Sequence, residues 1–267
     1  PAGLYYDEAG NERYYDNETD NYTQHHVQLL FSRELAEDLT WNSVLHYTAG
    51  GGYYENYKMN RKFSEYGLPL QVIDSKEYKR SDVIIRQALA NDYYAASSTL
   101  QLNRKSLKAT GGLSYSYYDG SHFGNLIWSK WRENIPDNYR WYLNDGYKGD
   151  LSLFARAELN ISEKITTFAD LQYRNISYSL RGEDKDFVQL NYDNKYNFFN
   201  PKAGITYNSG SSRVFASASV GRKEPGRADI KESIKAGKAD LIKPERLIDI
   251  EAGYTFTGKS VALSANF

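Results

Sequence analysis

Histidines and carboxylates are the residues of this sequence that could perform catalysis or bind a metal. His25 and His26 are neighbours, so on a strand their side chains point to opposite faces and cannot chelate one metal together. His46 and His122 have no metal-ligand spacing around them, and cysteine is absent. No pair of Asp or Glu residues can be selected as a general acid and base. We therefore expect no enzyme, no catalytic residue, no metal site and no intrinsic cofactor.

A different chemistry is offered by "WSKWRENIPDNYRW", residues 128–141. Its rings and cations could stack on a flat ligand or neutralise an anionic one. The candidate ligand-binding residues are Trp128, Trp131, Arg132, Tyr139, Arg140 and Trp141. The alternative, which we favour, is an aromatic belt at a membrane interface together with a loop that packs on itself.

The segment "GRKEPGRADIKESIKAGKADLIKPERL", residues 221–247, is rich in basic side chains. Its pattern predicts a short helix near 228–236 within a long loop. Four cations are available to an anionic ligand, namely Arg222, Lys223, Arg227 and Lys231. A solvated charge cluster explains the same composition equally well.

Strands must position these residues, because polar and apolar side chains alternate along most of the chain. In "YKGDLSLFARAELNIS", residues 147–162, every second residue from Leu151 to Ile161 is apolar. In residues 164–180, Ala169, Leu171 and Tyr173 share one face, whereas the other face, expected to point to a lumen or plug, carries Asp170, Gln172 and Arg174. The chain reads as about ten strands with one apolar face each.

The connections between these strands fall into two sizes that alternate. Short turns are expected near residues 36–39, 104–106, 162–164, 208–211 and 257–259, and long polar segments at about 58–91, 120–147, 182–195 and 223–246. This asymmetry is typical of an outer-membrane β-barrel, which has short periplasmic turns and longer outside loops. A soluble β-sandwich would show turns about every 8 to 12 residues.

The stretch "LHYTAGGGYYENYK", residues 45–58, interrupts one strand with three glycines. Gly50 to Gly52 remove side chains where the backbone bends or another group approaches closely, and Tyr53, Tyr54 and Tyr57 follow where the strand leaves lipid. A phosphate-binding glycine loop would need a different glycine spacing and a following helix. Neither is present.

Composition excludes several classes of protein. With 25 Tyr, 11 Phe and 4 Trp among 267 residues the chain is too aromatic for a disordered one. A net charge of -1 argues against a nucleic-acid partner. No run of about 18 apolar residues occurs, so the sequence predicts no transmembrane helix.

Three segments carry a resemblance to a known family. "TTFADLQYRNISYSLRG", "FFNPKAGITYNSGSSRVFASASVGRKEP" and "LIKPERLIDIEAGYTF" are similar to successive pieces of the barrel of TonB-dependent outer-membrane receptors, and "HYTAGGGYYENYK" resembles an earlier hairpin of that barrel. The order of the segments matches over most of the chain. The resemblance implies an all-β fold, an antiparallel transmembrane β-barrel in the outer membrane of a Gram-negative bacterium.

In such receptors about 22 strands enclose a plug domain. Residues 1–267 would then be a partial barrel domain, without the N-terminal plug and the terminal strands. The resemblance implies active import of a scarce, bulky ligand with energy from the TonB complex. The implied partners are outer-membrane lipid, the protein's own plug domain, the TonB complex and a surface lipoprotein, with no nucleic acid.

The ligand is narrowed by a departure from the family pattern. Haem receptors often carry a haem-contacting His between two loop motifs, and the matching place here, from "GRKEP" at 221 to "IKPE" at 242, has none. A ferric siderophore or cobalamin is therefore favoured over haem. Two rival functions stay open, a passive porin-like channel and a soluble β-rich module for glycan binding or adhesion.

Overall fold

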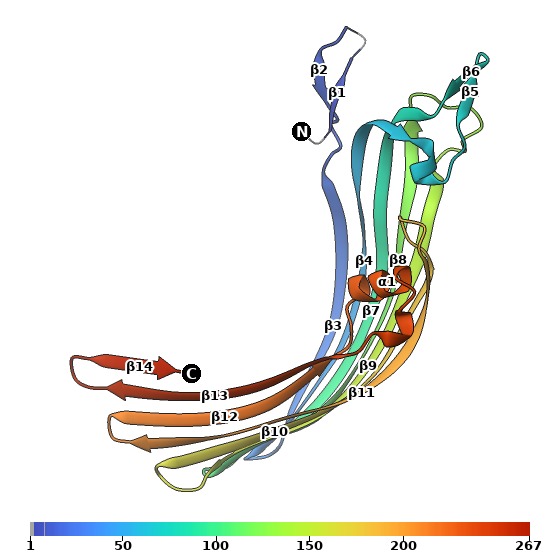
Figure 1. Ribbon diagram of the computed structural model, residues 1–267. Helices are drawn as coiled ribbons and strands as arrows, with labels where there is room; N and C mark the ends of the chain where they lie inside the picture. The colour runs from blue at the N-terminus through green and yellow to red at the C-terminus, as the bar shows by residue number, and fades with distance from the viewer. Residues whose placement is uncertain (1–2, 8) are drawn as a thin grey trace.

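One large antiparallel sheet dominates the computed structural model, which describes residues 3–7 and 9–267 (Figure 1). Its spatial order runs from β14 through β13, β12, β11, β10, β9, β8, β7 and β4 to β3. The ten strands are β3 (Asp20–Ala36), β4 (Leu39–Lys62), β7 (Arg80–Asn103), β8 (Leu107–Ser129), β9 (Tyr139–Asn160), β10 (Ile165–Glu183), β11 (Gln189–Ser209), β12 (Ser212–Lys223), β13 (Glu245–Thr257) and β14 (Ala262–Asn266). This confirms the expected number of strands.

Smaller elements precede β3 or lie in the long connections, on the side of the sheet opposite the short turns. Two hairpins, β1 (Leu4–Tyr6) with β2 (Glu12–Tyr14) and β5 (Gln71–Ile73) with β6 (Lys76–Tyr78), stand at the upper end in Figure 1. The connection between β12 and β13 holds helix α1 (Arg227–Lys235), as expected for residues 228–236, and the 3₁₀ turn η2 (Ala239–Leu241). A second 3₁₀ turn, η1 (Phe63–Tyr66), follows β4. The large sheet curves into an open trough with β3 and β14 at its edges.

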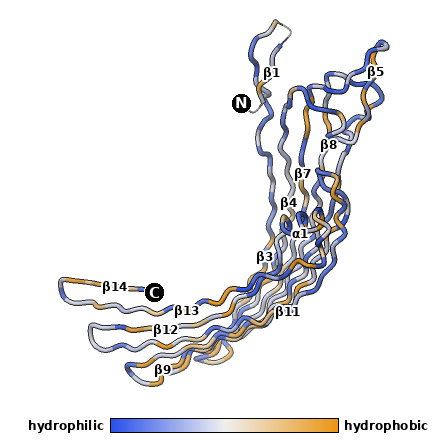
Figure 2. Tube along the Cα trace, in the orientation of Figure 1, coloured by the Kyte–Doolittle hydropathy of each residue, from blue (hydrophilic) through white to orange (hydrophobic). Residues whose placement is uncertain are grey.

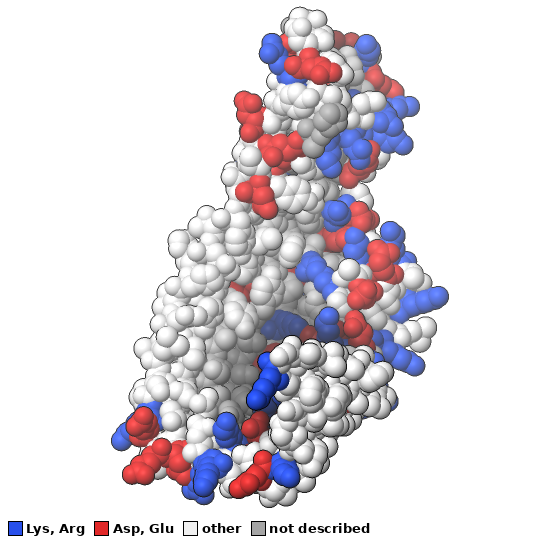
Figure 3. Space-filling model, turned by 90° about the vertical axis from the view of Figure 1, so that its left-hand side faces the viewer, with Lys and Arg blue, Asp and Glu red and all other residues white. Residues whose placement is uncertain are grey.

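The convex face of the trough is apolar over the lower part of the strands. Val27, Leu171 and Ile250 are 66%, 46% and 75% exposed, and the residues that alternate with them face the trough. Figure 2 shows hydrophobic residues concentrated in this lower part, and Figure 3 shows charged side chains gathered at the two ends and inside the hollow. A soluble protein rarely exposes so continuous an apolar surface, so this face requires lipid.

Among the described residues, no helix has the length and apolar character needed to cross a membrane.

The long polar segments expected at 58–91, 120–147 and 182–195 are mostly strand, so this expectation was wrong. β4 continues to Lys62 and β7 begins at Arg80, and the connection between β10 and β11 is only residues 184–188. The strands extend past the lipid-facing part, where polar side chains occur on both faces and Val83, Ile85 and Leu126 pack into a buried cluster. Period-two alternation disappears there although the backbone pairing continues, so sequence pattern alone reads these extensions as loops.

The glycine stretch lies in the middle of β4, where Tyr22 of β3 lies across it. A Cβ at Gly50 would overlap the Tyr22 hydroxyl, and a Cβ at Gly52 would overlap the backbone oxygen of Asn21. A Cβ at Gly51 would lie 3.7 Å from the Leu89 oxygen, an ordinary contact. The close approach that the sequence predicted is therefore present at Gly50 and Gly52.

We expect Gly52→Ala to destabilise the barrel by about 1 to 3 kcal/mol, because the backbone of β3 must move away from the new methyl group. Gly51→Ala is the matched control and should change stability by less than about 1 kcal/mol. Both variants are compared by urea unfolding of the full-length protein in detergent. Equal midpoints for the two variants would contradict the packing described for Gly52.

Candidate functional site in the trough

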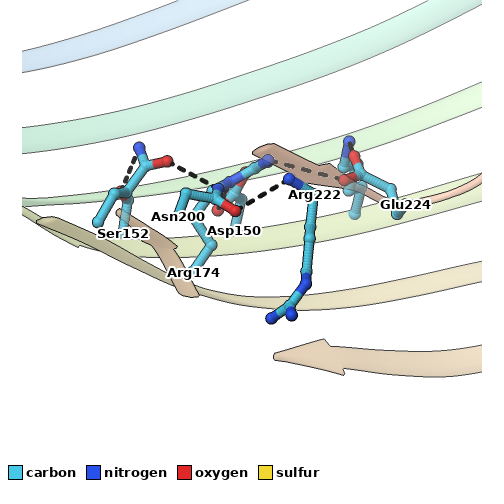
Figure 4. Close-up of polar contacts among 8 residues, drawn as sticks. Asp150, Ser152, Arg174, Asn200, Arg222 and Glu224 are labelled. Atoms are coloured by element: carbon cyan, nitrogen blue, oxygen red, sulfur yellow. Dashed lines mark hydrogen bonds and ion pairs between the residues drawn. The ribbon is translucent and has the colours of Figure 1, made fainter. Parts of the chain in front are cut away.

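A ladder of polar side chains crosses the concave face of the sheet from β9 to β12. Gln172 donates through Nε2 to Ser152 Oγ at 3.2 Å, and Asn200 donates through Nδ2 to Gln172 Oε1 at 3.2 Å. The backbone N–H of Arg222 donates to Asn200 Oδ1 at 2.9 Å (Figure 4). This polar ladder, defined as Ser152, Gln172 and Asn200, lines the concave wall of the trough.

A group of four charges lies beside the polar ladder. Arg174 bonds Asp150, with Nε 3.4 Å from Oδ1, and its Nη1 lies 3.7 Å from Glu224 Oε2. Lys148 pairs with Glu224 Oε1, and the Glu224 side chain is only 6% exposed. Glu224 Oε2 has no hydrogen-bond partner in the described part of the chain, so its contact with Arg174 is ionic rather than directional. This ion-pair group of Lys148, Asp150, Arg174 and Glu224 ties the start of the α1 loop to the wall (Figure 4).

The loop that contains α1 folds into the trough. Ile230 is fully buried against Leu180, Leu190 and Tyr192 of β10 and β11. Arg227 donates to Asn144 of β9, and Asn144 donates in turn to the Glu183 backbone oxygen at 2.9 Å. Figure 1 shows α1 within the concave side of the sheet, so this loop narrows the path along the trough.

Lys231, in α1, binds the helix to the connection between β10 and β11, where it pairs with Asp184 and Asp186. The hydrogen bond from Lys231 lowers the pKa of Asp186 below 3.8. Burial works to lower the pKa of Lys231, but hydrogen bonds to Asp184 and Asp186 outweigh burial and raise this pKa above 10.5. The ion pair therefore contributes fully to docking of the α1 loop between pH 3.8 and pH 10.5, the ordinary pKa values of the two groups.

We expect docking of the α1 loop to weaken at both extremes of pH. As the pH falls through the lowered pKa of Asp186 its carboxylate becomes protonated, and as the pH rises through the raised pKa of Lys231 its ammonium group loses its charge, so the pair is lost in each case. Hydrogen exchange of residues 227–235 in the full-length protein should be slowest between these limits. After correction for the intrinsic pH dependence of exchange, the rates in Lys231→Met should not vary with pH, which would assign the effect to this ion pair. Rates that do not vary with pH in the wild type would contradict the prediction.

A second feature is a pocket of about 370 Å³ at the upper end of the trough. It is formed by the extensions of β4 and β7, by η1, by Trp141 and by the β10–β11 connection, and its lining is Lys58, Arg61, Glu65, Tyr66, Ile85, Gln87, Trp141, Lys185, Asp186 and Phe187. We call it the upper pocket. Trp141 is 6% exposed, and its buried Nε1 has no hydrogen-bond partner among the described residues. A free buried donor beside basic side chains suits an anionic, aromatic ligand.

The electrostatics of the upper pocket favour an anion. Arg61 is paired with Glu65, and Asp186 with Lys231, so both carboxylates of the lining already have cationic partners. Lys58 lies beyond the lipid-facing part of β4; burial and the nearby charges of Arg61 and Lys185 lower its pKa. An anion between Lys58 and Lys185 would relieve this repulsion.

The structure separates the aromatic and basic residues of segment 128–141. Trp131 and Tyr139 pack against a buried cluster that contains Trp141, together with Phe63 and Tyr66. Trp128 is 39% exposed and stacks on Tyr57, Arg140 lies 4.8 Å above the Phe123 ring, and Arg132 bonds within its own loop to Ile135 and Asp137. Of this segment, only Trp141 lines the upper pocket.

The remaining candidates lie on both faces of the sheet. Arg227 faces the trough, and Lys223 is paired in register with Glu245. The Arg222 side chain points away from the polar ladder (Figure 4). Gln172 and Arg174 belong to the network on the trough wall, and Asp170 lies in register between Arg156 and Lys202. A ligand-binding role for Arg222, Lys223 and Arg227 stays a prediction, as does a lumen- or plug-facing role for Asp170, Gln172 and Arg174.

Sequence reasoning missed the acidic partners and the lysines of both sites. Glu224 contacts Lys148, which lies 76 positions away in the sequence. Lys58 of β4 and Lys185 of the β10–β11 connection also come from distant segments, which line one pocket. His26 and His46 also come together, through a shared hydrogen bond with Thr48. Within residues 3–7 and 9–267, no group of three or more His, Asp or Glu side chains is placed to hold a metal ion.

Comparison with known proteins places this architecture. The model of the family "TonB dependent receptor-like, beta-barrel" matches residues 1–267, and no curated protein matches the chain. Among solved structures, the copper transporter OprC has a TM-score of 0.67 at 10% identity over 96% of this chain and 40% of its own. The ferric-catecholate import receptor Fiu from E. coli K12 has a TM-score of 0.63 at 13% identity, over 96% of this chain and 42% of its own.

The siderophore receptor PiuA from Acinetobacter baumannii has a TM-score of 0.61 at 14% identity, over 92% of this chain and 39% of its own. At these identities the structural likeness shows the fold alone. The chain spans about two fifths of the length of these structures. Because the family model matches along the whole sequence, the chain belongs to the TonB-dependent receptor family, as part of the β-barrel.

Proposed function

We propose that the full-length protein is an active transport receptor of the outer membrane that captures an anionic, metal-bearing ligand in the upper pocket and imports it with TonB-derived energy. The observation that carries this proposal is the pocket itself, in which Lys58 and Lys185 lie beside Trp141, Tyr66 and Phe187. Its volume of about 370 Å³ falls within the range of small-molecule sites. The ring faces and the ammonium groups suit a flat, negatively charged chelate.

A ferric siderophore is the favoured ligand. Ferric siderophores with catecholate or carboxylate groups are anionic, and the names of Fiu and PiuA support this class of cargo. Cobalamin and haem remain outcomes of the test, haem with less weight because residues 221–245 contain no His. The proposal includes the protein's own plug domain, the TonB complex, the surrounding outer-membrane lipid and a surface lipoprotein as partners.

The ligand can be identified from the metal and the spectrum that the full-length receptor retains after exposure to ferric siderophores, haem and cobalamin in detergent. Iron without a haem absorption band supports the proposal. Iron with such a band would assign haem, and cobalt would assign cobalamin; either result overturns the siderophore assignment. Retention of no metal would contradict uptake of a metal chelate as a whole.

Energy coupling separates the receptor from a porin-like channel. Uptake of the identified ligand by cells that express the full-length protein should stop when TonB is deleted or the proton gradient is dissipated, while binding at the cell surface continues. Uptake that persists without TonB would favour the passive channel. The soluble glycan-binding or adhesion module is contradicted by membership of an outer-membrane barrel family.

We expect Lys58→Gln to weaken binding of an anionic ferric siderophore about tenfold or more, because a charge-assisted contact contributes about 1.5 to 3 kcal/mol. Lys105→Gln, in the short turn at the opposite end of the sheet, is the matched control and should leave affinity unchanged. Affinity is measured by tryptophan fluorescence of the full-length receptor. Unaltered binding in Lys58→Gln would remove the upper pocket from the capture site without contradicting uptake itself.

A further inference from the structure

The convex face of the sheet changes character at the upper edge of its apolar band. On each strand from β7 to β13, an outward series of apolar side chains gives way to a polar residue on the same face. Toward the upper end of the sheet, the next residue on the outward face is Asp92 after Tyr94, Asn175 after Tyr173, and Arg222 after Val220. The full set of these first polar residues is Asp92, Asp119, Asp145, Asn175, Asn197, Arg222 and Arg246.

This edge is sorted by charge around the wall. Carboxylates occupy it on β7, β8 and β9, amides on β10 and β11, and arginines on β12 and β13. Most of the carboxylates and amides have local partners: Tyr47 donates to Asp92 at 2.6 Å, Ser121 to Asp145 at 2.6 Å, and Asn175 to Asn197 at 2.7 Å. Asp119, opposite Asp92 in the register of β7 and β8, has no hydrogen-bond or ion-pair partner among the described residues. The two arginines form the cationic part of this edge.

Arg222 and Arg246 are directly opposite each other in the register of β12 and β13. Directly opposed like charges destabilise a sheet. Among the ion pairs of residues 3–7 and 9–267, none includes either arginine. In Figure 4 the Arg222 side chain points away from Asn200, Arg174 and Glu224, to the opposite side of the sheet. An anion outside the protein would satisfy both guanidinium groups.

The surface directly below the arginines is built for acyl chains. Val220 and Ile248 are paired in register one outward position below Arg222 and Arg246, and Ala218 with Ile250 one further below. Ile248 and Ile250 are 58% and 75% exposed. Cations immediately above an exposed apolar stripe match a lipid, whose anionic head lies above its chains. A free anion without acyl chains would leave this apolar stripe uncovered.

We propose that Arg222 and Arg246 form a binding site for the phosphate group of an outer-leaflet lipid, with its acyl chains against Val220, Ile248 and Ile250. The end of the sheet with the long connections is the outside end in this family, so the arginines lie at the outer leaflet. Guanidinium groups bind phosphate in a bidentate manner, and two of them face the same space. The carboxylates on β7 to β9 would repel the same headgroup, which makes the site local to β12 and β13.

The test is native mass spectrometry of the full-length receptor in detergent, titrated with lipid A and with lipid A from which the phosphates have been removed. The wild type should bind lipid A and bind the dephosphorylated form poorly. Arg222→Gln/Arg246→Gln should weaken lipid A binding about thirtyfold, as expected for loss of two surface cations. Arg222→Lys/Arg246→Lys keeps both charges and should retain most of the binding.

Lys105→Gln/Lys259→Gln is the control, because it removes two cations from the short turns at the other end of the sheet. It should bind lipid A as the wild type does. Equal binding by the Gln variant and the wild type would overturn the proposal, as would equal binding of dephosphorylated lipid A. Displacement of lipid A by an equal concentration of inorganic phosphate would show a free-anion site instead. Heat-modified gel migration confirms that each variant is a folded barrel.

Discussion

Arg174→Met is expected to lower the free energy of unfolding of the full-length barrel by about 2 to 4 kcal/mol, because it leaves Asp150 and the nearly buried Glu224 without this cationic partner. The Arg174 side chain is 20% exposed, and Lys148 still compensates Glu224, so the cost is below that of a fully buried, uncompensated charge. The measurement is urea unfolding in detergent micelles. The loss should shrink when Asp150 is also replaced by Asn, because the two changes affect one interaction.

Arg181→Met is the matched control for this prediction, since it changes the same residue type in the same strand. Its ion pair with Asp193 is exposed on both sides, at 43% and 64%, and such pairs contribute about 1 kcal/mol or less. A loss in Arg174→Met no larger than that in Arg181→Met would show that the ion-pair group contributes nothing beyond a surface pair.

Ile230→Asp should release the α1 loop from the trough while the barrel stays folded. Ile230 is fully buried among Leu180, Leu190 and Tyr192, and loss of this packing together with burial of a carboxylate costs at least about 3 kcal/mol of docking free energy. Because the helix contacts the wall through one buried side chain and a few polar contacts, the response is local. Hydrogen exchange of residues 227–235 should accelerate about a hundredfold or more.

Leu241→Asp tests whether any new charge in this loop has the same effect. Leu241 is 68% exposed in η2 of the same connection, so its replacement should leave exchange of α1 unchanged. The urea midpoint of both variants should stay near that of the wild type. A large drop of the midpoint in Ile230→Asp would mean that the loop is part of the cooperative fold of the barrel.

The barrel architecture could be predicted because lipid imposes a strict alternation on each strand. The alternation predicts that Leu171 and Tyr173 face lipid, and both side chains are exposed, whereas Gln172 and Arg174 bond to neighbouring strands within the trough. That Gln172 and Arg174 face a lumen or plug stays a prediction. Family membership confirms the resemblance, the all-β barrel fold and the location in the outer membrane of a Gram-negative bacterium, and makes the chain part of a receptor rather than an enzyme. The short turns near residues 104–106 and 162–164 were predicted correctly.

The sites could not be predicted to the same degree, because alternation gives the face of a residue but not its neighbours. Arg222 illustrates this. The sequence places it with Arg227 in one basic segment, but the two side chains lie on opposite sides of the sheet. Trp141 is the residue left unpaired by a register shift between β8 and β9, and both it and the next residue, Tyr142, belong to the buried cluster. Such irregularities depend on packing between distant segments and leave no period in the sequence.

The continuation of β4 and β7 beyond the lipid has a consequence for the thermodynamics of capture. The upper pocket is framed by paired strands, so Lys58, Ile85 and Gln87 are held by backbone hydrogen bonds of the sheet before any ligand arrives. A ligand that binds there orders little additional chain and loses little affinity to conformational entropy. Selection can then alter the lining one side chain at a time, and so change which chelate is captured, without disturbing the register that closes the wall.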